Sequence, residues 1–121
     1  MLIGYARVST QDQDPEMQVD ALRNAGCEKI FVEKASGAKR DRPELTAAIA
    51  YARKDDTIVV WKLDRLARSL KQLIETVEGL EETGVGFRSL TETIDTTTPG
   101  GRLVFTIFAG LAEFERSIIR E

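Results

Sequence analysis

The 121 residues are the size of a single domain, and a composition that is 42% hydrophobic and 31% charged is ordinary for a globular protein. The chain contains no histidine, which excludes a Ser-His-Asp triad, a Cys-His pair and imidazole-ligated metals within it. A net charge of −3 excludes an overall basic character, so any polyanion must be met by local clusters of arginine.

The first predicted element is an apolar strand that breaks into polar residues, within residues 2–13. In open α/β sheets ligands bind at the carboxyl ends of the strands, and Ser9 stands at that end. Arg7 lies two residues earlier and therefore on the same face of the strand. A hydroxyl beside a cation suggests a nucleophile for an anionic group. The plainer alternative, a turn-capping serine and a solvated arginine, stays open for this stretch alone.

A helix is predicted next, with Asp14 as its N-cap, Pro15 as its first residue and Gly26 just after its end. The apolar positions expected to face inward are Met17, Ala21, Leu22 and Ala25. Residues 29–33 predict a short second strand, and the polar, glycine-containing residues 34–42 predict a loop.

Asp41 is predicted to cap the following helix, which has Pro43 near its start. The next strand covers residues 57–61. It is apolar throughout, so we expect it to be central and covered on both faces. A further helix is predicted over residues 69–83, with Gly84 as its stop.

A fourth strand is predicted over residues 85–90, and a threonine-rich loop over residues 91–98. Strands and helices thus alternate along the chain. This alternation predicts an α/β fold with a largely parallel central sheet of four to five strands, flanked by helices and joined by right-handed crossovers.

The last predicted helix begins at Pro99 and has apolar residues on nearly every side of its first turns. These residues are Leu103, Val104, Phe105, Ile107, Phe108 and Leu111. A small sheet covers only one side of such a helix, so we expect the other side to pack on a second subunit. The alternative is a helix buried wholly within the domain.

Polar residues follow two of the predicted parallel strands, and their side chains converge if those strands are neighbours. Arg7 and Ser9 come from the first strand, whereas Asp64, Arg65 and Arg68 follow the third. Arg65 and Arg68 are three residues apart, so one helical turn would point both the same way. Guanidinium groups bind phosphate oxygens with two parallel hydrogen bonds, so this cluster around a serine suits a phosphodiester. Each charge taken alone is also typical of a solvated surface.

Four stretches of the chain share their order and spacing with a known protein family. They are Tyr5-Ala-Arg-Val-Ser-Thr, Asp41-Arg-Pro-Glu-Leu, Val60-Trp-Lys-Leu-Asp-Arg-Leu-Ala-Arg-Ser and Phe87-Arg-Ser-Leu. Together they resemble the catalytic domain of the small serine recombinases, which are DNA resolvases and invertases. The resemblance covers essentially the whole chain.

This resemblance implies that Ser9 attacks DNA, forms a 5′-phosphoserine bond and releases a 3′-hydroxyl. The family's active-site arginines match Arg7, Arg65 and Arg68, and its neighbouring carboxylate matches Asp64. Further positions, which support the site or the DNA phosphate, match Gln13, Gln18 and Arg42. No metal ion or other cofactor is implied, because arginines neutralise the charge that Mg²⁺ neutralises in other phosphoryl-transfer enzymes.

The implied organisation is a catalytic core over residues 1–98 and, over residues 99–121, the start of a long dimerisation helix. In the family this helix leads to a helix-turn-helix DNA-binding domain, which is expected to be absent from residues 1–121. The implied partners are double-stranded DNA and further copies of the chain, as a dimer and as a synaptic tetramer. One alternative is a non-catalytic module that assembles and holds DNA. The other, a domain binding a small phosphorylated molecule, lacks support because neither glycine-rich phosphate motif is present.

The location of the protein is predicted from three absences. A single cysteine, Cys27, cannot form an internal disulfide, and no stretch approaches the roughly 20 apolar residues of a membrane span. The first residues also lack a signal-peptide pattern. We therefore expect a cytoplasmic protein without membrane contact, in which Cys27 is a buried spectator thiol.

Overall fold

The computed structural model describes residues 1–9, 14–35, 42–67 and 69–120, apart from the side chains of Pro15, Ala35, Asp64 and residues 112–120. The strands are β1 (Leu2–Ser9), β2 (Lys29–Ala35), β3 (Thr57–Val60), β4 (Gly86–Ser89) and β5 (Ile94–Asp95). The helices are α1 (Pro15–Asn24), α2 (Pro43–Tyr51), α3 (Leu63–Leu66), α4 (Leu70–Glu82) and α5 (Pro99–Arg120). None of the helices described is both long and apolar enough to cross a membrane.

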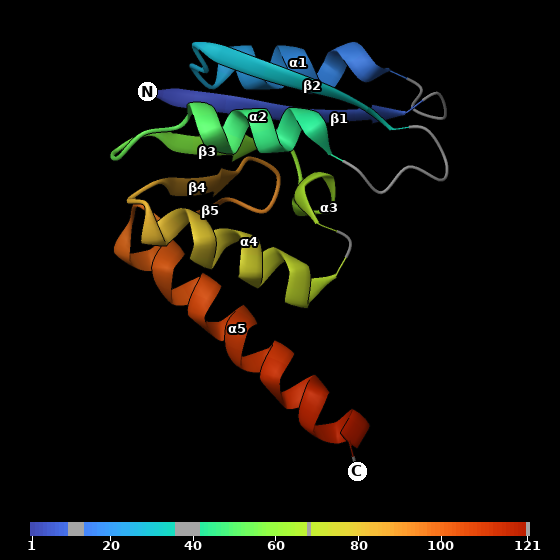
Figure 1. Cartoon of the computed structure of the whole chain (residues 1–121), viewed down its shortest axis with the longest axis vertical. Helices are drawn as coiled ribbons and strands as arrows, with labels where there is room; N and C mark the ends of the chain where they lie inside the picture. The colour runs from blue at the N-terminus through green and yellow to red at the C-terminus, as the bar shows by residue number, and fades with distance from the viewer. Residues whose placement is uncertain (10–13, 36–41, 68, 121) are drawn as a thin grey trace.

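The strands form one mostly parallel sheet in the order β2-β1-β3-β4-β5 (Figure 1). β1 lies between β2 and β3 and runs parallel to both, with Tyr5 opposite Phe31 on one side and Val60 on the other. Only β5 runs antiparallel, against β4. The predicted α/β class is therefore confirmed. The structure also meets the condition for convergence of the polar residues, because β1 and β3 are neighbours.

The sheet separates two unequal layers of apolar side chains. Successive residues of a strand point to opposite faces, so Ile3 and Tyr5 face one layer and Ala6 faces the other. The larger layer includes residues of α2, α3, α4 and α5, and the smaller one contains Leu22 of α1. All four residues of β3 are buried, as their continuous apolar pattern predicted.

The ends of the helices follow local sequence signals in most places. Ser69 caps α4 by accepting a hydrogen bond from the amide of Gln72 at 3.1 Å. Gly26 and Gly84 have φ values of +100° and +77°, the left-handed conformation that ends a helix without steric cost in glycine. Asp14 is the N-cap of α1 as predicted, and Pro15 is its first residue, but the Asp14 side chain makes no capping hydrogen bond. The predicted cap at Asp41 lies outside the described residues, and Arg42 is the N-cap of α2.

Three further expectations are corrected by tertiary packing. Met17 was expected to face inward but is 41% exposed, and the neighbouring Gln18 is buried in its place. The threonine-rich segment contains the short strand β5, because Ile94 pairs with Ser89 at the sheet edge. One helical turn after β3 was expected to carry both Arg65 and Arg68, but the described turn ends at Leu66 and Ala67 is extended. Arg68 itself lies outside the described residues.

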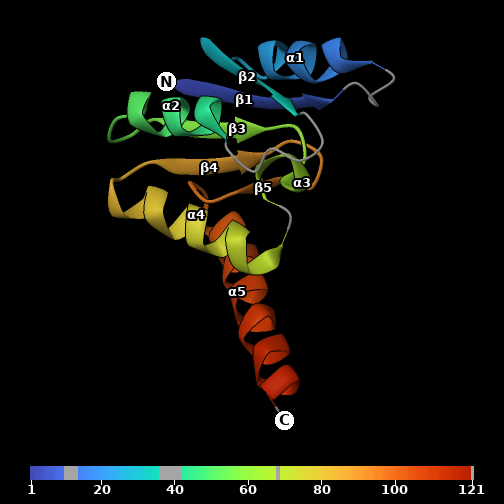
Figure 2. The same cartoon turned by 45° about the vertical axis from the view of Figure 1, so that its right-hand side comes forward.

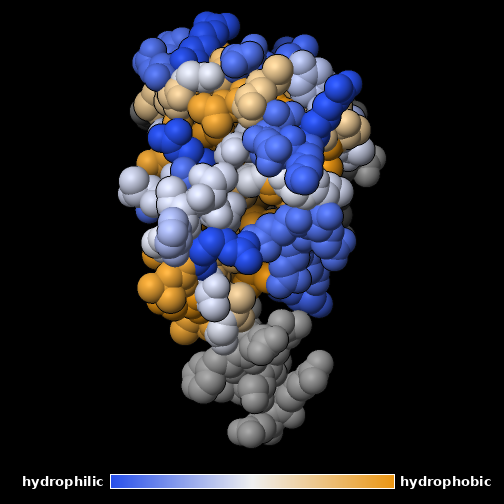
Figure 3. Space-filling view, turned by 90° about the vertical axis from the view of Figure 1, so that its left-hand side faces the viewer, coloured by the Kyte–Doolittle hydropathy of each residue, from blue (hydrophilic) through white to orange (hydrophobic). Residues whose placement is uncertain are grey.

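Helix α5 leaves the sheet and projects beyond α4 (Figures 1 and 2). Phe105 is buried in the larger core, where it shares a cluster with residues of α4 and the sheet. Leu103, Val104, Ile107 and Leu111 remain exposed, and Figure 3 shows apolar surface gathered in the lower part of the molecule. The helix is thus covered on one side by its own domain.

Candidate active site at the carboxyl ends of β1 and β3

Three of the residues predicted to carry chemistry belong to neighbouring elements: Arg7 and Ser9 lie at the end of β1, and Arg65 lies in α3, which follows β3. The ends of β1 and β3 lie close to α3 (Figures 1 and 2). Ser9 is the last residue of β1, is paired with Ala35 of β2, and is partly exposed. Arg7 lies two residues earlier on the same strand and is also partly exposed. A nucleophile here is accessible to a large substrate, because neither side chain is enclosed by the core.

Arg65 joins the two strand ends. It belongs to α3, which follows β3, and its guanidinium Nη1 donates a hydrogen bond to the carbonyl oxygen of Arg7 at 3.3 Å. The same guanidinium lies over the Trp61 ring, with its carbon 5.7 Å from the ring centroid. Lys62 Nζ is 4.7 Å from the same ring. The Arg65 guanidinium therefore lies beside the end of β1.

Gln18 approaches the same carbonyl from α1. Its side-chain Nε2 donates to the carbonyl oxygen of Arg7 at 3.1 Å, and the residue is 1% exposed. The Arg7 carbonyl thus accepts hydrogen bonds from both α1 and α3. These two hydrogen bonds hold the backbone two residues before Ser9.

Arg42 ties the start of α2 to α3. Its Nη1 donates a hydrogen bond to the carbonyl oxygen of Leu66. Arg42 and Arg7 both act electrostatically on the hydroxyl of Tyr5, where their positive charges oppose the rise of its pKa.

Three predicted site residues cannot be placed. Gln13 and Arg68 lie outside the described residues. The backbone of Asp64 belongs to α3, but its side chain is likewise outside the described part of the chain.

Glu33 is a buried carboxylate next to β1 that the sequence analysis did not single out. It is 6% exposed, stands opposite Arg7 in the β1–β2 register, and accepts a hydrogen bond from the Tyr5 hydroxyl at 3.4 Å. The same Oε1 atom accepts from the amides of Glu44 and Leu45 at 3.1 and 3.3 Å, at the N-terminus of α2. The available signal was an acidic residue inside a short strand, which is unusual unless it has buried partners.

Replacing Glu33 with alanine is expected to destabilise the fold by about 2–3 kcal/mol, because buried donors lose a charged acceptor. Glu33→Gln keeps an oxygen at that position and is expected to lose less. Urea unfolding followed by circular dichroism measures both. Equal unfolding free energies for Glu33→Ala and the unmodified protein would contradict this role.

The same variants test the electrostatics of Tyr5. Burial, followed by the negative charge of Glu33, raises the pKa of Tyr5 to about 12. Tyr5 thus contributes stability that is fully present below pH 10.0, its ordinary pKa, and is lost as the pH rises through about 12. Glu33→Gln removes the charge, so the Tyr5 pKa should fall. Ultraviolet titration in a Tyr51→Phe background, which leaves Tyr5 as the one tyrosine, measures it.

Cys27 lies at the junction between α1 and β2 and contributes no nucleophile. It packs against the smaller apolar layer, and burial raises its pKa to about 11. A thiol with this pKa is protonated at neutral pH, and only the thiolate is strongly nucleophilic. This agrees with the predicted spectator role.

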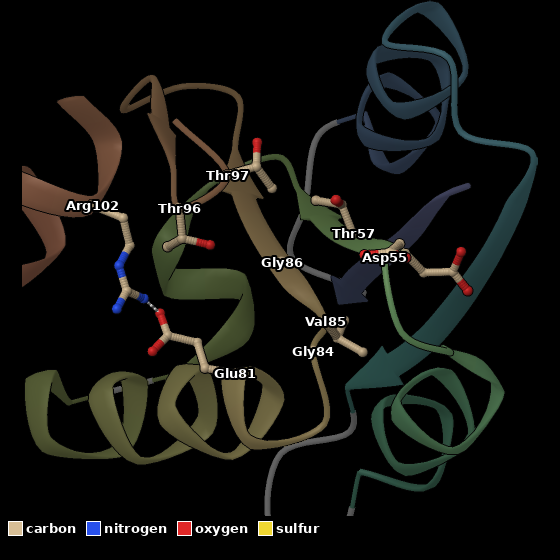
Figure 4. Close-up of a pocket in the computed structure, with 10 residues that line it drawn as sticks. Asp55, Thr57, Glu81, Gly84, Val85, Gly86, Thr96, Thr97 and Arg102 are labelled. Atoms are coloured by element: carbon tan, nitrogen blue, oxygen red, sulfur yellow. Dashed lines mark ion pairs between the residues drawn. The ribbon is translucent and has the colours of Figure 1, made fainter. Parts of the chain in front are cut away.

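A separate cavity of about 590 Å³ lies at the other end of the strands (Figure 4). Thr57 and Gly86, the first residues of β3 and β4, line it, and an ion pair joins Glu81 of α4 to Arg102 of α5. Ser9 and Arg65 lie at the carboxyl ends of parallel strands, whereas this cavity lies at their amino ends. The cavity is therefore distinct from the candidate active site.

Comparison with known proteins identifies the family of this arrangement. The family model described as "Resolvase, N terminal domain" matches residues 2–121. The chain is 55% identical to the serine recombinase gin of Escherichia phage Mu, and 53% identical to a DNA-invertase of Escherichia phage P1. It is 50% identical to the transposon Tn917 resolvase of Enterococcus faecalis. Each match covers 100% of this chain but only 63%, 65% and 66% of these relatives, respectively.

A solved structure gives the same answer for the fold. The N-terminal catalytic domain of TP901-1 integrase superposes with a TM-score of 0.82 at 32% sequence identity. The alignment covers 97% of both chains. The similarity therefore extends over the sheet, the helices around it and the edge that carries Ser9.

Proposed function

This chain belongs to the resolvase N-terminal domain family of serine recombinases, and we propose that it catalyses strand cleavage and rejoining in site-specific DNA recombination. The observation that carries the proposal is the bridge from Arg65 to the Arg7 carbonyl, at 3.3 Å, beside the strand end that bears Ser9. It joins a hydroxyl and guanidinium groups from separate segments into one site. Such a site suits a phosphodiester.

The proposed reaction is a transesterification. The Oγ atom of Ser9 attacks the phosphorus, the bond from phosphorus to the 3′-oxygen breaks, and the released 3′-oxygen takes up a proton. A general base takes up the serine proton. A second 3′-hydroxyl then attacks the phosphoserine, which regenerates Ser9. The bond energy is kept in the protein–DNA ester, so no nucleotide cofactor is required.

Arginines supply the charge stabilisation in this proposal. In this proposal Arg7 and Arg65 bind the non-bridging phosphate oxygens. The proposal is supported by the position of Arg7 two residues before Ser9 on β1, and by the hydrogen bond from Arg65 Nη1 to the Arg7 carbonyl oxygen. Arg42, bound to the end of α3, and Gln18, bound to the Arg7 carbonyl, would hold the site in shape. For Arg68, Asp64 and Gln13 the roles come from the family motif.

The proposed partners are double-stranded DNA and further copies of the chain, in a dimer and a synaptic tetramer. The exposed apolar residues of α5 support self-association, because their burial against a second copy would remove apolar surface from water. In this proposal residues 1–98 form the catalytic core and residues 99–121 begin the dimerisation helix. Sequence recognition belongs to a helix-turn-helix domain beyond them, and the location is cytoplasmic.

Trapping a covalent DNA–protein adduct tests the proposal. A recombinase that contains this chain and a DNA-binding domain is incubated with a duplex carrying its recombination site, and the adduct is digested and mapped by mass spectrometry. A phosphodiester link at Ser9 supports an enzyme. Stable DNA complexes without any adduct would favour the non-catalytic assembly module.

Residues 1–121 alone are expected to bind duplex DNA weakly and with a steep dependence on salt. The net charge is −3, and the available cations are confined to local clusters. Each phosphate neutralised gives a slope of about −0.9 in a plot of log affinity against log salt. Fluorescence anisotropy with specific and scrambled duplexes measures this. Sequence-specific binding by residues 1–121 at physiological salt would contradict the prediction.

A further inference from the structure

We propose that Glu92 is a positioning residue for Arg65, through a hydrogen bond to the first residue of α3. Glu92 lies in the connection between β4 and β5, outside every motif singled out in the sequence. The inference rests on the proposed function, since it concerns the active-site arginine. In this inference the segment after β4, which lies on the side of β3 opposite to β1, helps to hold the active-site helix α3 in place.

Helix α3 lacks a capping hydrogen bond from its own N-cap side chain. This helix is a single turn, and its N-cap is Lys62. The first amides of a helix have no acceptor within the helix, so an acceptor must come from elsewhere. A lone turn without one is marginal, because a short helix has little cooperativity.

Glu92 supplies this acceptor from 29 residues along the chain. The amide of Leu63, the first residue of α3, donates to Glu92 Oε1 at 3.3 Å and to Oε2 at 3.4 Å. The hydroxyl of Ser89 donates to the same Oε1 atom. Ser89 is 1% exposed and is the last residue of β4, so the Glu92 carboxylate is anchored to the sheet.

Backbone hydrogen bonds hold the segment before Glu92 against the segment that leads from β3 into α3. The amides of Leu90 and Thr91 donate to the carbonyl oxygens of Val60 and Trp61 at 3.0 and 2.9 Å. Thr93 then has a φ of +57°, a left-handed conformation that is uncommon outside glycine and turns the chain back towards β5. The segment that carries Glu92 therefore runs beside the segment from β3 into α3.

These contacts set the position of Arg65. It lies two residues after Leu63, its own amide closes the turn on the Lys62 carbonyl at 3.1 Å, and its side chain lies by Trp61. The β4–β5 connection thus holds the backbone on which Arg65 stands, through the Trp61 carbonyl and the Leu63 amide. Loss of Glu92 would let the turn open and lower the fraction of molecules with Arg65 in place.

The test measures two quantities in a recombinase that contains this chain and a DNA-binding domain. They are the rate of covalent adduct formation at saturating DNA, and the DNA concentration that gives half-saturation. The variants are Glu92→Ala, Glu92→Gln and Ser89→Ala. Glu78→Ala is the matched control, because Glu78 is an exposed glutamate on α4. Hydrogen exchange of the Leu63 amide is followed in the same proteins.

Glu92→Ala is expected to slow adduct formation by about tenfold to a hundredfold, the effect typical of a lost hydrogen bond to a charged group. The half-saturating DNA concentration and the melting temperature should stay close to those of the unmodified protein, and the Leu63 amide should exchange faster. Glu92→Gln keeps the oxygen acceptor and should restore most of the rate. Ser89→Ala should have a smaller effect, which adds little once Glu92 is alanine.

Several outcomes would overturn the inference. An unchanged rate in Glu92→Ala would do so, as would a rate in Glu92→Gln as low as in Glu92→Ala, because that pattern reports a charge effect on DNA. If Glu92→Ala does not fold, the comparison of Glu92→Gln and Ser89→Ala with the unmodified protein decides. An unmodified protein that forms no adduct contradicts the proposed function instead, and the exchange rate of the Leu63 amide then still tests the contact.

Discussion

Ser9→Ala is expected to abolish formation of the covalent DNA adduct while leaving the fold and DNA binding intact. Ser9 is the last residue of β1 and carries the hydroxyl proposed as the nucleophile. Two residues earlier, Arg65 and Gln18 both donate hydrogen bonds to the Arg7 carbonyl oxygen and so hold this end of the strand. Removing the nucleophile of an enzyme that works through a covalent intermediate lowers its rate by roughly a millionfold. Denaturing gel electrophoresis of labelled DNA measures the adduct, and circular dichroism measures the fold.

The control for this experiment is Thr76→Ala, which removes a hydroxyl from α4 that donates a hydrogen bond to the Gln72 carbonyl oxygen of the same helix. It should form the adduct at the rate of the unmodified protein. Alanine at Arg7, Arg65 or Arg68 should slow the reaction by about 10²–10³, the effect of losing one donor to a developing charge. An adduct that persists in Ser9→Ala would rule out Ser9 as the nucleophile.

Phe105→Asp is expected to unfold the domain, whereas Ile107→Asp should leave it folded and weaken self-association. The two residues are two positions apart on α5 and point to different sides of the helix. Phe105 is 7% exposed, whereas Ile107 is 55% exposed. Removing a buried phenylalanine costs about 3–5 kcal/mol before any cost of the buried charge, against a total stability of about 5–15 kcal/mol. Circular dichroism with urea unfolding measures this difference.

The same pair of variants separates the core side of α5 from its partner side. Sedimentation over a concentration series should show the unmodified chain associating and Ile107→Asp remaining monomeric. Association loses translational and rotational freedom, and this cost is comparable to the free energy gained by burying apolar surface. We therefore expect the unmodified chain to associate only at high protein concentration. A chain that stays monomeric at millimolar concentration would contradict the idea that a second copy covers Leu103, Val104 and Ile107.

The sequence determined the elements of this fold because the signals for them are local. Continuous apolar residues predicted β3 as a central strand, and glycines with positive φ end α1 and α4 where expected. Ser69 caps α4 through a contact three residues away. The sequence also placed Ser9 and Arg65 at the same end of the sheet, because the carboxyl ends of parallel strands lie together.

Only the tertiary structure decided which groups support that site. Glu33 reaches Tyr5 across 28 residues, Glu92 reaches Leu63 across 29, and Arg65 reaches the Arg7 carbonyl across 58. Periodicity and capping patterns report on neighbours within a few residues and carry no information about such distant contacts. For the same reason the pattern of α5 showed apolar residues on all sides, and the packing of α4 and the sheet decided that Phe105 is buried and Ile107 exposed.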